Sequence, residues 1–326
     1  MSPSSTPSCA RPETAFWSRR TAPGSLDVPC LKLDGVLLFG NVQVTTQALV
    51  ELLDHGIELA LFSLGGRLRG QLTPPKAKNV LLRVRQYELH RDQAFCLRLS
   101  RELVVAKIAN AASVLRRHRA NAPETVAAAE AAEIERAVGA ARAAVSLDVL
   151  RGIEGAATRR YFRALAGIVP PAFAFEGRSR RPPRDPCNAL LSFGYVLVGN
   201  ELQALLDGIG FDPYIGFFHQ LDYGRPSLAL DLVEEFRAPL VDRLSATLLN
   251  RGELAAGDFA GTPERGIVLT REALKRYLAA YERELTEPRA VEGEQLSFRQ
   301  LFRRQAERLA RALTAGEPYR SFRLPC

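Results

Sequence analysis

The sequence is poor in the residues that form disulfide scaffolds and small metal-binding folds. Its 326 residues include five cysteines and four histidines, with no C-x-x-C pair and no cluster of cysteine and histidine at the spacing of a metal site. The odd number and the scatter of the cysteines argue against a disulfide framework, a zinc ribbon or an iron–sulfur centre. We therefore expect a protein of the reducing cytoplasm.

Long apolar runs and several common catalytic motifs are also absent. No stretch approaches the roughly 20 uninterrupted apolar residues that a bilayer span needs, and the first 17 residues have no apolar segment of the kind found in signal peptides. The motifs G-x-S-x-G, G-x-x-x-x-G-K-[ST] and H-E-x-x-H do not occur, and no G-x-G-x-x-G opens a helix. With 47% hydrophobic and 25% charged residues, the chain has the composition of a globular protein with enough apolar mass for two domains.

Lysine is scarce, and arginine supplies most of the positive charge. The 44 basic residues include only five lysines and outnumber the 36 acidic residues, which gives a net charge of +8. Because the planar guanidinium group grips phosphate bidentately, an excess of arginine favours nucleic acid as a partner. A GC-rich gene would enrich both arginine and alanine, so composition alone leaves both interpretations open.

The periodicity along the chain predicts an α+β fold, in which a small N-terminal β-rich domain precedes a larger all-α domain. Residues 1–26 lack periodicity and are expected to be a flexible segment. Residues 27–72 alternate as strands do, around one short helix, and residues 73–79 break both periods as a linker does. Residues 80–326 are expected to form the helical domain. The helices expected there span Leu81–Ala120 (as one helix or two), Pro123–Val145, Leu147–Val169, Asn188–Leu206, Ser227–Asn250, Thr270–Leu285 and Phe298–Leu313.

A carboxylate on the apolar face of one expected helix is the first candidate site residue. Glu154 falls within about 40° of Leu150 and Leu165 around the helix axis, so it faces the core or a cleft. An unpaired buried carboxylate costs several kcal/mol, so Glu154 should have a cationic partner. That partner is either an arginine, with Arg159 and Arg160 close by, or a metal ion.

The other candidates lie close together further along the chain. His219 follows an apolar run and precedes a turn, where an imidazole can face a cleft, although a lone histidine is more often packed and hydrogen-bonded. Asp231 and Glu234 share one face of the next helix at positions i and i+3. Glu235 is a competing carboxylate whose angle places it nearer the solvent edge. A solvated acidic face is the alternative interpretation of this helix.

Together these residues form a hard donor set of carboxylates and one imidazole, without a thiolate. Such a set suits Mg²⁺ or Mn²⁺ better than structural Zn²⁺, and Mg²⁺ typically keeps waters and binds phosphate oxygens. Metal-assisted phosphodiester chemistry is therefore the use that the sequence favours for Glu154, His219, Asp231 and Glu234.

Two arginine-rich segments supply candidate contacts to DNA. The loop at residues 178–186, RSRRPPRDP, could screen the charge of a substrate. Three arginines share one face of the last expected helix, and Arg311 is the third of them. A phosphate-binding stripe and an ordinary solvated face are both compatible with that pattern. The candidate DNA-binding residues are Arg178, Arg180, Arg181 and Arg184 in the loop and Arg304 and Arg308 on the helix.

Four long segments carry a resemblance to a known family. They are LFGNVQVTTQAL (Leu38–Leu49), LRGIEGAATRRYF (Leu150–Phe162), RRPPRDPCNALLSFGY (Arg180–Tyr195) and DPYIGFFHQLDYGRPSLALDLVEEFR (Asp212–Arg237). In their order and spacing they resemble the CRISPR-associated spacer-acquisition integrase, the first Cas protein, from about residue 31 to the C-terminus. The metal-binding residues of that family match Glu154, His219, Asp231 and Glu234, and many members have Asp at the last position.

The resemblance implies a fold, partners and a reaction. The implied fold is a small β-rich domain before a larger helical domain that bears a metal-dependent catalytic site. The implied assembly is a homodimer that docks on a small dimeric CRISPR-associated companion subunit. In the implied reaction, the 3′-hydroxyl of a short prespacer DNA fragment attacks a phosphodiester at the boundary of a repeat, which inserts the fragment into the array as a spacer. A metal-dependent endonuclease that hydrolyses branched or single-stranded DNA is the alternative, and a catalytically idle DNA-binding scaffold is another.

The N-terminus departs from this family pattern. Family members usually lead into the LFGN segment with alternating strand residues, and residues 1–25 show no such alternation. We therefore expect the N-terminal sheet to be short of strands.

Overall fold

The computed structural model divides into two compact units, Met1–Pro75 and Lys76–Cys326. It describes residues 28–30, 33, 35–63, 68–73, 79–121, 128–179 and 181–324. The segment 1–26 that the sequence predicts to be flexible, most of the expected linker 73–79, and Arg180 lie outside the described residues.

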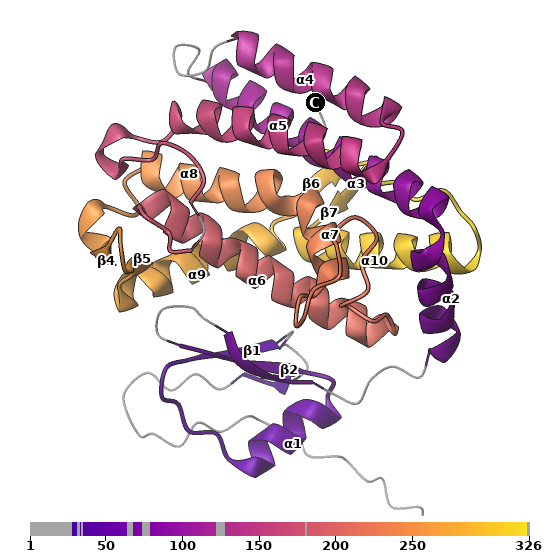
Figure 1. Cartoon of the computed structure of the whole chain (residues 1–326). Coiled ribbons are helices and arrows are strands. Elements are labelled where there is room, and N and C mark those ends of the chain that lie inside the picture. The colour runs from indigo at the N-terminus through magenta and orange to yellow at the C-terminus, as the bar shows by residue number, and fades with distance from the viewer. Residues whose placement is uncertain are drawn as a thin grey trace, which may run out of the picture. The chain divides into compact units, whose positions relative to one another are not determined.

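In its described part, the first unit holds a three-stranded sheet and one helix (Figure 1). Strands β1 (Gly35–Phe39) and β2 (Glu58–Phe62) pair in parallel, and β3 (Leu68–Leu72) pairs antiparallel with β2. Helix α1 (Thr46–Asp54) makes the crossover that two parallel neighbours require. The sequence predicts strands around one short helix within residues 27–72, and the described residues of that range have a strand, a helix and two strands in this order. Apolar residues of α1 and β2 pack with Cys30 to form the core of the unit.

The second unit is mainly helical. The helices of its first half are α2 (Val80–Arg91), α3 (Gln93–Asn121), α4 (Ala128–Ala143), α5 (Leu147–Ala166) and α6 (Pro186–Ile209). Those of its second half are α7 (Ser227–Phe236), α8 (Arg243–Asn250), α9 (Arg271–Thr286) and α10 (Phe298–Thr314). Helices α3, α4 and α5 pack together as one layer, and α7 packs against both α3 and α6. The sequence predicts either one helix or two over residues 81–120, and the structure has two, α2 and α3.

Helix α6 is the one helix in the described part of the chain that is long and apolar enough to cross a membrane by length and composition. Half of its most apolar window is buried within the second unit, where the helix contacts α7 and α10. A core helix needs the same composition, so its position explains its apolar character.

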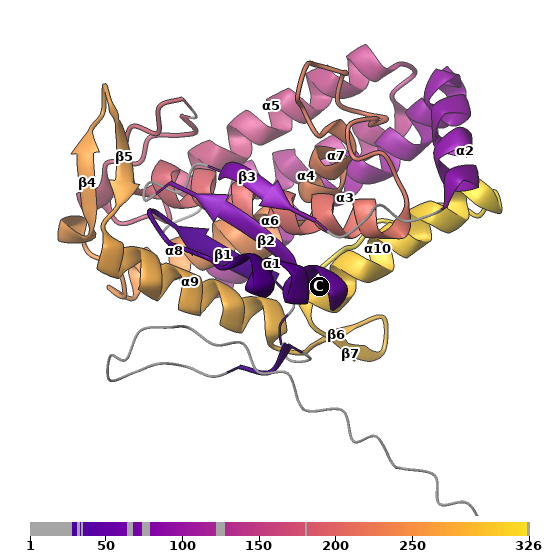
Figure 2. The same ribbon diagram turned by 90° about the horizontal axis from the view of Figure 1, so that it is seen from below.

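The larger unit is not all-α, which corrects the sequence-based expectation. Strands β4 (Phe259–Thr262) and β5 (Gly266–Leu269) form one hairpin, and β6 (Arg289–Val291) and β7 (Glu294–Leu296) form another. Figure 2 shows the β4–β5 hairpin at one end of this unit and α2 at the other. Strands of three or four residues are too short to produce a recognisable alternation in sequence, which is why periodicity does not predict the hairpins.

The helix expected over Ser227–Asn250 is interrupted after Phe236. Residues Arg237–Asp242 form a π-helical turn, and Pro239 lies within it. Proline has no amide hydrogen and its ring clashes with the preceding turn of a regular α-helix, so a wider turn accommodates it. The interruption leaves the side chain of Arg237 beside Glu234, with Nη1 3.2 Å from Oε1.

The last described residues, 319–324, pack beside α7 and bind Glu235. The Glu235 carboxylate accepts hydrogen bonds from the Phe322 amide (2.6 Å), the Gln305 side chain (2.8 Å) and the Tyr319 hydroxyl. The predicted position of Glu235 near the solvent edge is therefore wrong, because this residue is fully buried. Burial raises the pKa of Glu235 to about 7, although the three hydrogen bonds oppose the shift.

Asp242 gives the larger unit a pH-dependent stability. It is 1% exposed and accepts a hydrogen bond from Tyr195, and burial raises its pKa to about 6 against the opposing effects of Tyr195 and Arg237. An unfolded aspartate titrates near pH 3.9, so the folded state binds the proton more tightly. The contribution of Asp242 to stability should therefore be greatest below about pH 4 and should fall as pH rises through 6.

Asp242→Asn should remove the free-energy cost of burying an ionised carboxylate. The asparagine keeps an oxygen that can accept the hydrogen bond from Tyr195. At pH 7.5 we expect the free energy of unfolding to rise by up to about 3 kcal/mol, and near pH 4 we expect no gain. Urea unfolding across pH 4–8 measures both. Asp148→Asn, at a side chain that is 91% exposed, is the matched control and should change stability by less than about 0.5 kcal/mol. A loss of stability at pH 7.5 in Asp242→Asn would mean that ionised Asp242 is net favourable.

Candidate metal and catalytic site

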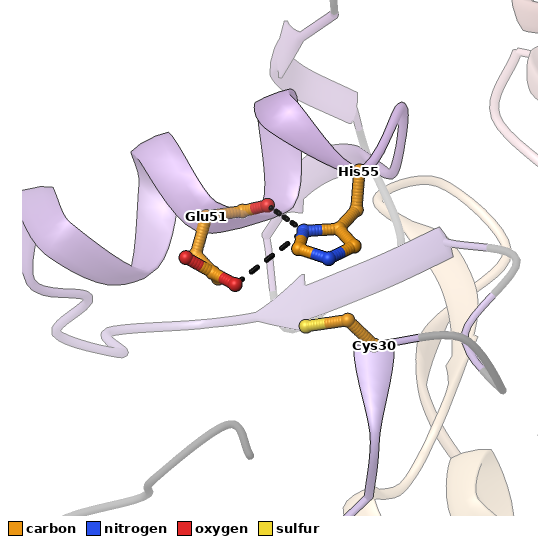
Figure 3. A group of neighbouring side chains, drawn as sticks. All are labelled: Cys30, Glu51 and His55. Atoms are coloured by element: carbon orange, nitrogen blue, oxygen red, sulfur yellow. Dashed lines mark hydrogen bonds and ion pairs between the residues drawn. The ribbon is translucent and has the colours of Figure 1, made fainter. Parts of the chain in front are cut away.

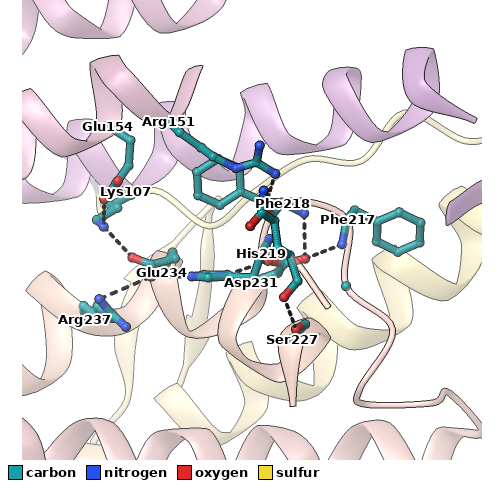
Figure 4. A network of polar contacts seen from close by, with 12 residues as sticks. Lys107, Arg151, Glu154, Phe217, Phe218, His219, Ser227, Asp231, Glu234 and Arg237 are labelled. Carbon is teal, nitrogen blue, oxygen red and sulfur yellow. Dashed lines mark hydrogen bonds and ion pairs between the residues drawn. The ribbon is translucent and has the colours of Figure 1, made fainter. Parts of the chain in front are cut away.

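The loop between α6 and α7 is held by the carboxylate of Asp231. Asp231 Oδ2 accepts hydrogen bonds from the amides of Phe217 (2.6 Å) and Phe218 (3.0 Å), and Oδ1 accepts from the amide of His219 (2.9 Å). The imidazole Nδ1 of His219 lies 2.7 Å from the same Oδ1 (Figure 4). Asp231 is buried, and these contacts satisfy its carboxylate from within the protein.

The contact with Asp231 fixes the orientation of the His219 ring. A carboxylate can only accept, so Nδ1 carries the hydrogen, and in the neutral ring, the form that binds a metal, Nε2 presents its lone pair on the other side. There Nε2 lies 3.7 Å from Glu234 Oε1. A carboxylate behind the ring is the usual support of a metal-binding histidine.

Glu234 is buried among positive charges. Its Oε2 lies 2.7 Å from Lys107 Nζ on α3, and its Oε1 lies close to Arg237. Burial opposes ionisation of Glu234, but Arg237, Lys107 and His219 together outweigh it and lower the pKa to about 2. The carboxylate is therefore a permanent anion, and its pairing with cations is what makes its burial tolerable.

Glu154 meets Glu234 across the same lysine. It projects from α5, where it accepts a hydrogen bond from Thr158 at 2.8 Å, and Lys107 Nζ contacts its Oε1. The sequence leaves an arginine or a metal ion as its partner, and the structure provides a lysine from α3 instead. Lys107 is the one charged residue in the segment LVVAKIANAA, a signal that could have identified it.

We call Lys107, Glu154, His219, Glu234 and Arg237 the Lys107 cluster. Its two carboxylates come from α5 and α7 and both contact the Lys107 ammonium group, and its imidazole, from the loop before α7, lies beside Glu234 (Figure 4). Glu234 Oε2 is buried and accepts no hydrogen bond, although it lies in ion-pair range of Lys107. Two carboxylates that share one cation, with an imidazole Nε2 beside one of them, are a donor set that suits a hard divalent metal. Three of the residues that the sequence predicts for the site thus meet here, and the structure gives the fourth, Asp231, a place behind His219.

Residues that the sequence does not single out anchor the loop from its other side. Gln86 on α2 is fully buried and donates to the carbonyl oxygens of Asp212 (2.8 Å) and Ile215 (2.7 Å). His90 Nδ1 lies 2.7 Å from the Gly216 carbonyl oxygen. Arg151, one turn before Glu154 on α5, donates to the Phe218 carbonyl at 3.0 Å. These side chains fix where His219 stands; Gln86 and His90 lie outside the four family segments, whereas Arg151 lies within Leu150–Phe162.

Gly216 is required where this loop crosses the start of α7. A Cβ there would lie 2.8 Å from the Ser227 carbonyl carbon and 2.9 Å from Asp231 Oδ2. We expect Gly216→Ala to cost about 1–3 kcal/mol of stability and to reduce activity, because the loop that carries His219 must shift. Chemical denaturation measures the first effect. Gly208→Ala, within α6 and with nothing inside 4 Å of the added atom, is the matched control and should be neutral or slightly stabilising. Equal stability in the two variants would contradict the close contact.

The arginines of the loop before α6 differ in their contacts and exposure. Arg178 is engaged internally, since it donates to Asn188 (2.8 Å) and Ser192 (3.0 Å). Arg181 and Arg184 are both exposed to solvent. Arg180 lies outside the described residues, so its role stays a prediction.

The arginines of α10 are paired with acids. Arg304 contacts Glu294 at 2.5 Å, Arg308 contacts Glu292 at 2.5 Å, and Arg311 contacts a third glutamate, Glu317, at 3.2 Å. Two of these acids belong to the β6–β7 hairpin or its turn. The pairing favours an ordinary ion-paired face over a phosphate-binding stripe.

Comparison with known proteins gives the family. The family model described as CRISPR associated protein Cas1 matches residues 15–283. A CRISPR-associated endonuclease Cas1 of Thermus thermophilus is 36% identical over 298 residues, which cover 90% of this chain and 86% of the relative. A CRISPR-associated exonuclease Cas4/endonuclease Cas1 fusion of Geobacter sulfurreducens is 39% identical over 299 residues, and the match covers 87% of this chain but only 52% of that protein. The chain belongs to the Cas1 family, which confirms the expectation from its sequence.

Solved structures agree with this assignment. A Cas1 protein from Thermotoga maritima has a TM-score of 0.79 at 27% identity, over 92% of both chains. The Cas6-RT-Cas1–Cas2 complex matches with a TM-score of 0.79 at 25% identity, over 93% of this chain and 33% of that one. A casposase bound to integration product has a TM-score of 0.83 at 22% identity, over 95% of this chain and 87% of that one, a likeness in fold alone.

Proposed function

We propose that this chain is a metal-dependent DNA strand-transferase of CRISPR adaptation. The 3′-hydroxyl of a short DNA fragment attacks a phosphodiester at a repeat boundary and inserts the fragment as a new spacer. The observation that carries the proposal is that Glu154 and Glu234 share the Lys107 ammonium group, a position already occupied by a positive charge, and that His219 Nε2 lies 3.7 Å from Glu234 Oε1. The cytoplasm, where such DNA lies, is the proposed location.

In this proposal Glu154, His219 and Glu234 hold Mg²⁺ or Mn²⁺. When bound, the ion would polarise the scissile phosphate and ready the attacking hydroxyl. Asp231 acts as a positioning residue, because it fixes the loop amides and directs the His219 ring. Lys107 and Arg237 keep Glu234 ionised, and Lys107 must move aside or pair with the substrate when the ion enters.

The proposed partners are DNA, a second copy of the chain and a small dimeric companion subunit. The name of the Cas6-RT-Cas1–Cas2 complex supports a Cas2-type companion, because the chain is similar to a Cas1 part of that assembly. The casposase structure, which is similar in fold, is described with an integration product, and this favours strand transfer over simple hydrolysis.

A strand-transfer assay tests the function directly. Purified chain and companion subunit are incubated with repeat DNA and a labelled fragment that ends in a 3′-hydroxyl or in a 3′-dideoxy group. We expect a branched product only with the hydroxyl end and only with Mg²⁺ or Mn²⁺. Cleavage that proceeds equally with the blocked fragment would favour the endonuclease alternative, and binding without any product would favour a scaffold.

The exposed arginines before α6 should contribute to DNA affinity by neutralising phosphates. We expect Arg181→Ala with Arg184→Ala to weaken duplex binding and to flatten the slope of log affinity against log salt by about 0.9 for each phosphate that the variant no longer neutralises. Arg304→Ala with Arg308→Ala removes the same charge from an ion-paired face and should leave the slope nearly unchanged. Fluorescence anisotropy at several salt concentrations measures both. The reverse result would assign DNA binding to α10.

A further inference from the structure

Three side chains of metal-ligand type meet in the first unit (Figure 3). The Cys30 sulfur, a carboxylate oxygen of Glu51 and a ring nitrogen of His55 all lie within 4.8 Å of one another. Cys30 precedes β1, whereas Glu51 lies on α1 and His55 caps its C-terminus. Spacing along the chain does not predict such a group, because a strand and most of a helix separate the cysteine from the histidine. We call these residues the Cys30 cluster, and they share no residue with the Lys107 cluster.

Helix α1 places two of the three candidate ligands, Glu51 and His55, on one face. Glu51 and His55 stand at i and i+4, the spacing that places two side chains on one helix face. His55 Nδ1 lies 2.9 Å from the Glu51 carbonyl oxygen, which can only accept, so Nδ1 carries the hydrogen. Nε2 is thereby left with its lone pair, and this backbone contact is of the kind that orients metal-bound histidines. The partial negative charge at the C-terminus of α1 also favours a cation.

The burial of the three residues suits a site at the rim of the core. Cys30 is 3% exposed and packs with Leu52, Ile57 and Leu59, whereas the side chains of Glu51 and His55 are about one-third exposed. An ion could therefore enter from solvent and keep one coordination position open to water. Ligand atoms around tetrahedral zinc stand about 3.3–3.6 Å apart, so the side chains must close by roughly 1 Å.

We propose that Cys30, Glu51 and His55 bind Zn²⁺ as a structural clip within the first unit. A donor set of sulfur, nitrogen and oxygen selects zinc over Mg²⁺ or Mn²⁺, which prefer oxygen. On binding, the Cys30 thiol releases its proton to solvent and the thiolate forms the bond to the ion. The clip joins the segment before β1 to the end of α1, in a unit whose apolar core is small. The competing interpretation is that Cys30 is an ordinary buried apolar residue.

Cobalt substitution tests the proposal in the full-length protein. The chain is stripped with EDTA, titrated with Co²⁺ and followed by absorption. We expect one equivalent to give both the d–d bands of a tetrahedral site and a thiolate-to-cobalt charge-transfer band, and Zn²⁺ to displace them. Because the Lys107 cluster has no thiolate, Glu154→Gln should leave the charge-transfer band unchanged.

Variants separate the site from an effect on folding. Cys30→Ser should abolish the charge-transfer band, and His55→Gln, at a partly exposed helix end, should keep the circular dichroism spectrum while weakening Zn²⁺ binding at least about tenfold. Cys9→Ser and Cys326→Ser are matched controls that should keep the band. Absence of the band in the wild-type chain, or its persistence in Cys30→Ser, would overturn the proposal.

Discussion

Glu234→Gln is expected to lower the rate of strand transfer by about a thousandfold or more. The reason is that a bound metal ion supplies several kcal/mol of transition-state stabilisation, and each 1.36 kcal/mol is a tenfold change in rate. The fold should survive at the assay temperature, because Lys107 keeps its contact with Glu154 and the Arg237 guanidinium lies 4.7 Å from the centre of the Tyr195 ring. Single-turnover strand-transfer kinetics measures the decrease, and Mn²⁺ titration followed by electron paramagnetic resonance measures binding of the ion.

Asp231→Asn is the informative comparison for that variant. An asparagine has one acceptor oxygen where Asp231 uses two, so the amides of Phe217, Phe218 and His219 cannot all be satisfied. We expect a decrease of about 10–100-fold in rate, with Mn²⁺ binding weakened rather than abolished, as for other residues that support a ligand. If Asp231→Asn abolishes Mn²⁺ binding and Glu234→Gln preserves it, the assignment of ligand and positioning residue must be exchanged.

Lys107→Met should destabilise the metal-free protein strongly. Lys107 is 13% exposed and pairs with Glu154 and with the buried Glu234, so its removal leaves two facing carboxylates short of a cation. Removal of one partner from a buried ion pair typically costs about 3–5 kcal/mol. We expect the melting temperature in EDTA to fall and Mg²⁺ or Mn²⁺ to restore more of it than in the wild type.

Lys275→Met is the matched control for the lysine. Lys275 pairs with Glu272 at the surface, where its side chain is 63% exposed, and a pair of that kind contributes less than about 1 kcal/mol. Differential scanning calorimetry with and without the metal compares the two variants. Equal, small effects in EDTA would show that Lys107 does not compensate the acids.

The sequence is informative where a polar residue interrupts an apolar pattern. Glu154 on an apolar helix face and His219 at the end of an apolar run can both be selected in this way, and the structure brings them to one cluster. Asp231 and Glu234 can be selected as a pair, but their roles cannot be told apart. The distinction depends on where the backbone amides of residues 217–219 point, and that is fixed by contacts from α2 and α5 that lie far away in sequence.

The predictions that proved wrong both rest on periodicity, which fails for two different reasons. Helical periodicity places Glu235 near solvent because it presumes a helix with an exposed side, yet every residue of α7 except Leu230 is buried. Periodicity describes a helix that lies on a surface, and it fails for one enclosed by α3, α6 and the C-terminal residues. The all-α expectation fails because the hairpins contain too few residues to show a period.

The two adjacent carboxylates of α7 also set how the helix is turned about its own axis. Consecutive residues of an α-helix point about 100° apart, so Glu234 can face Lys107 only while Glu235 faces Tyr319 and Phe322. A one-residue insertion before this pair would turn Glu234 towards the partners of Glu235, and a one-residue deletion would turn Glu235 towards Lys107. By binding Glu235, residues 319–324 therefore fix the rotation of α7 about its axis. They hold Glu234 at the angle that its site requires.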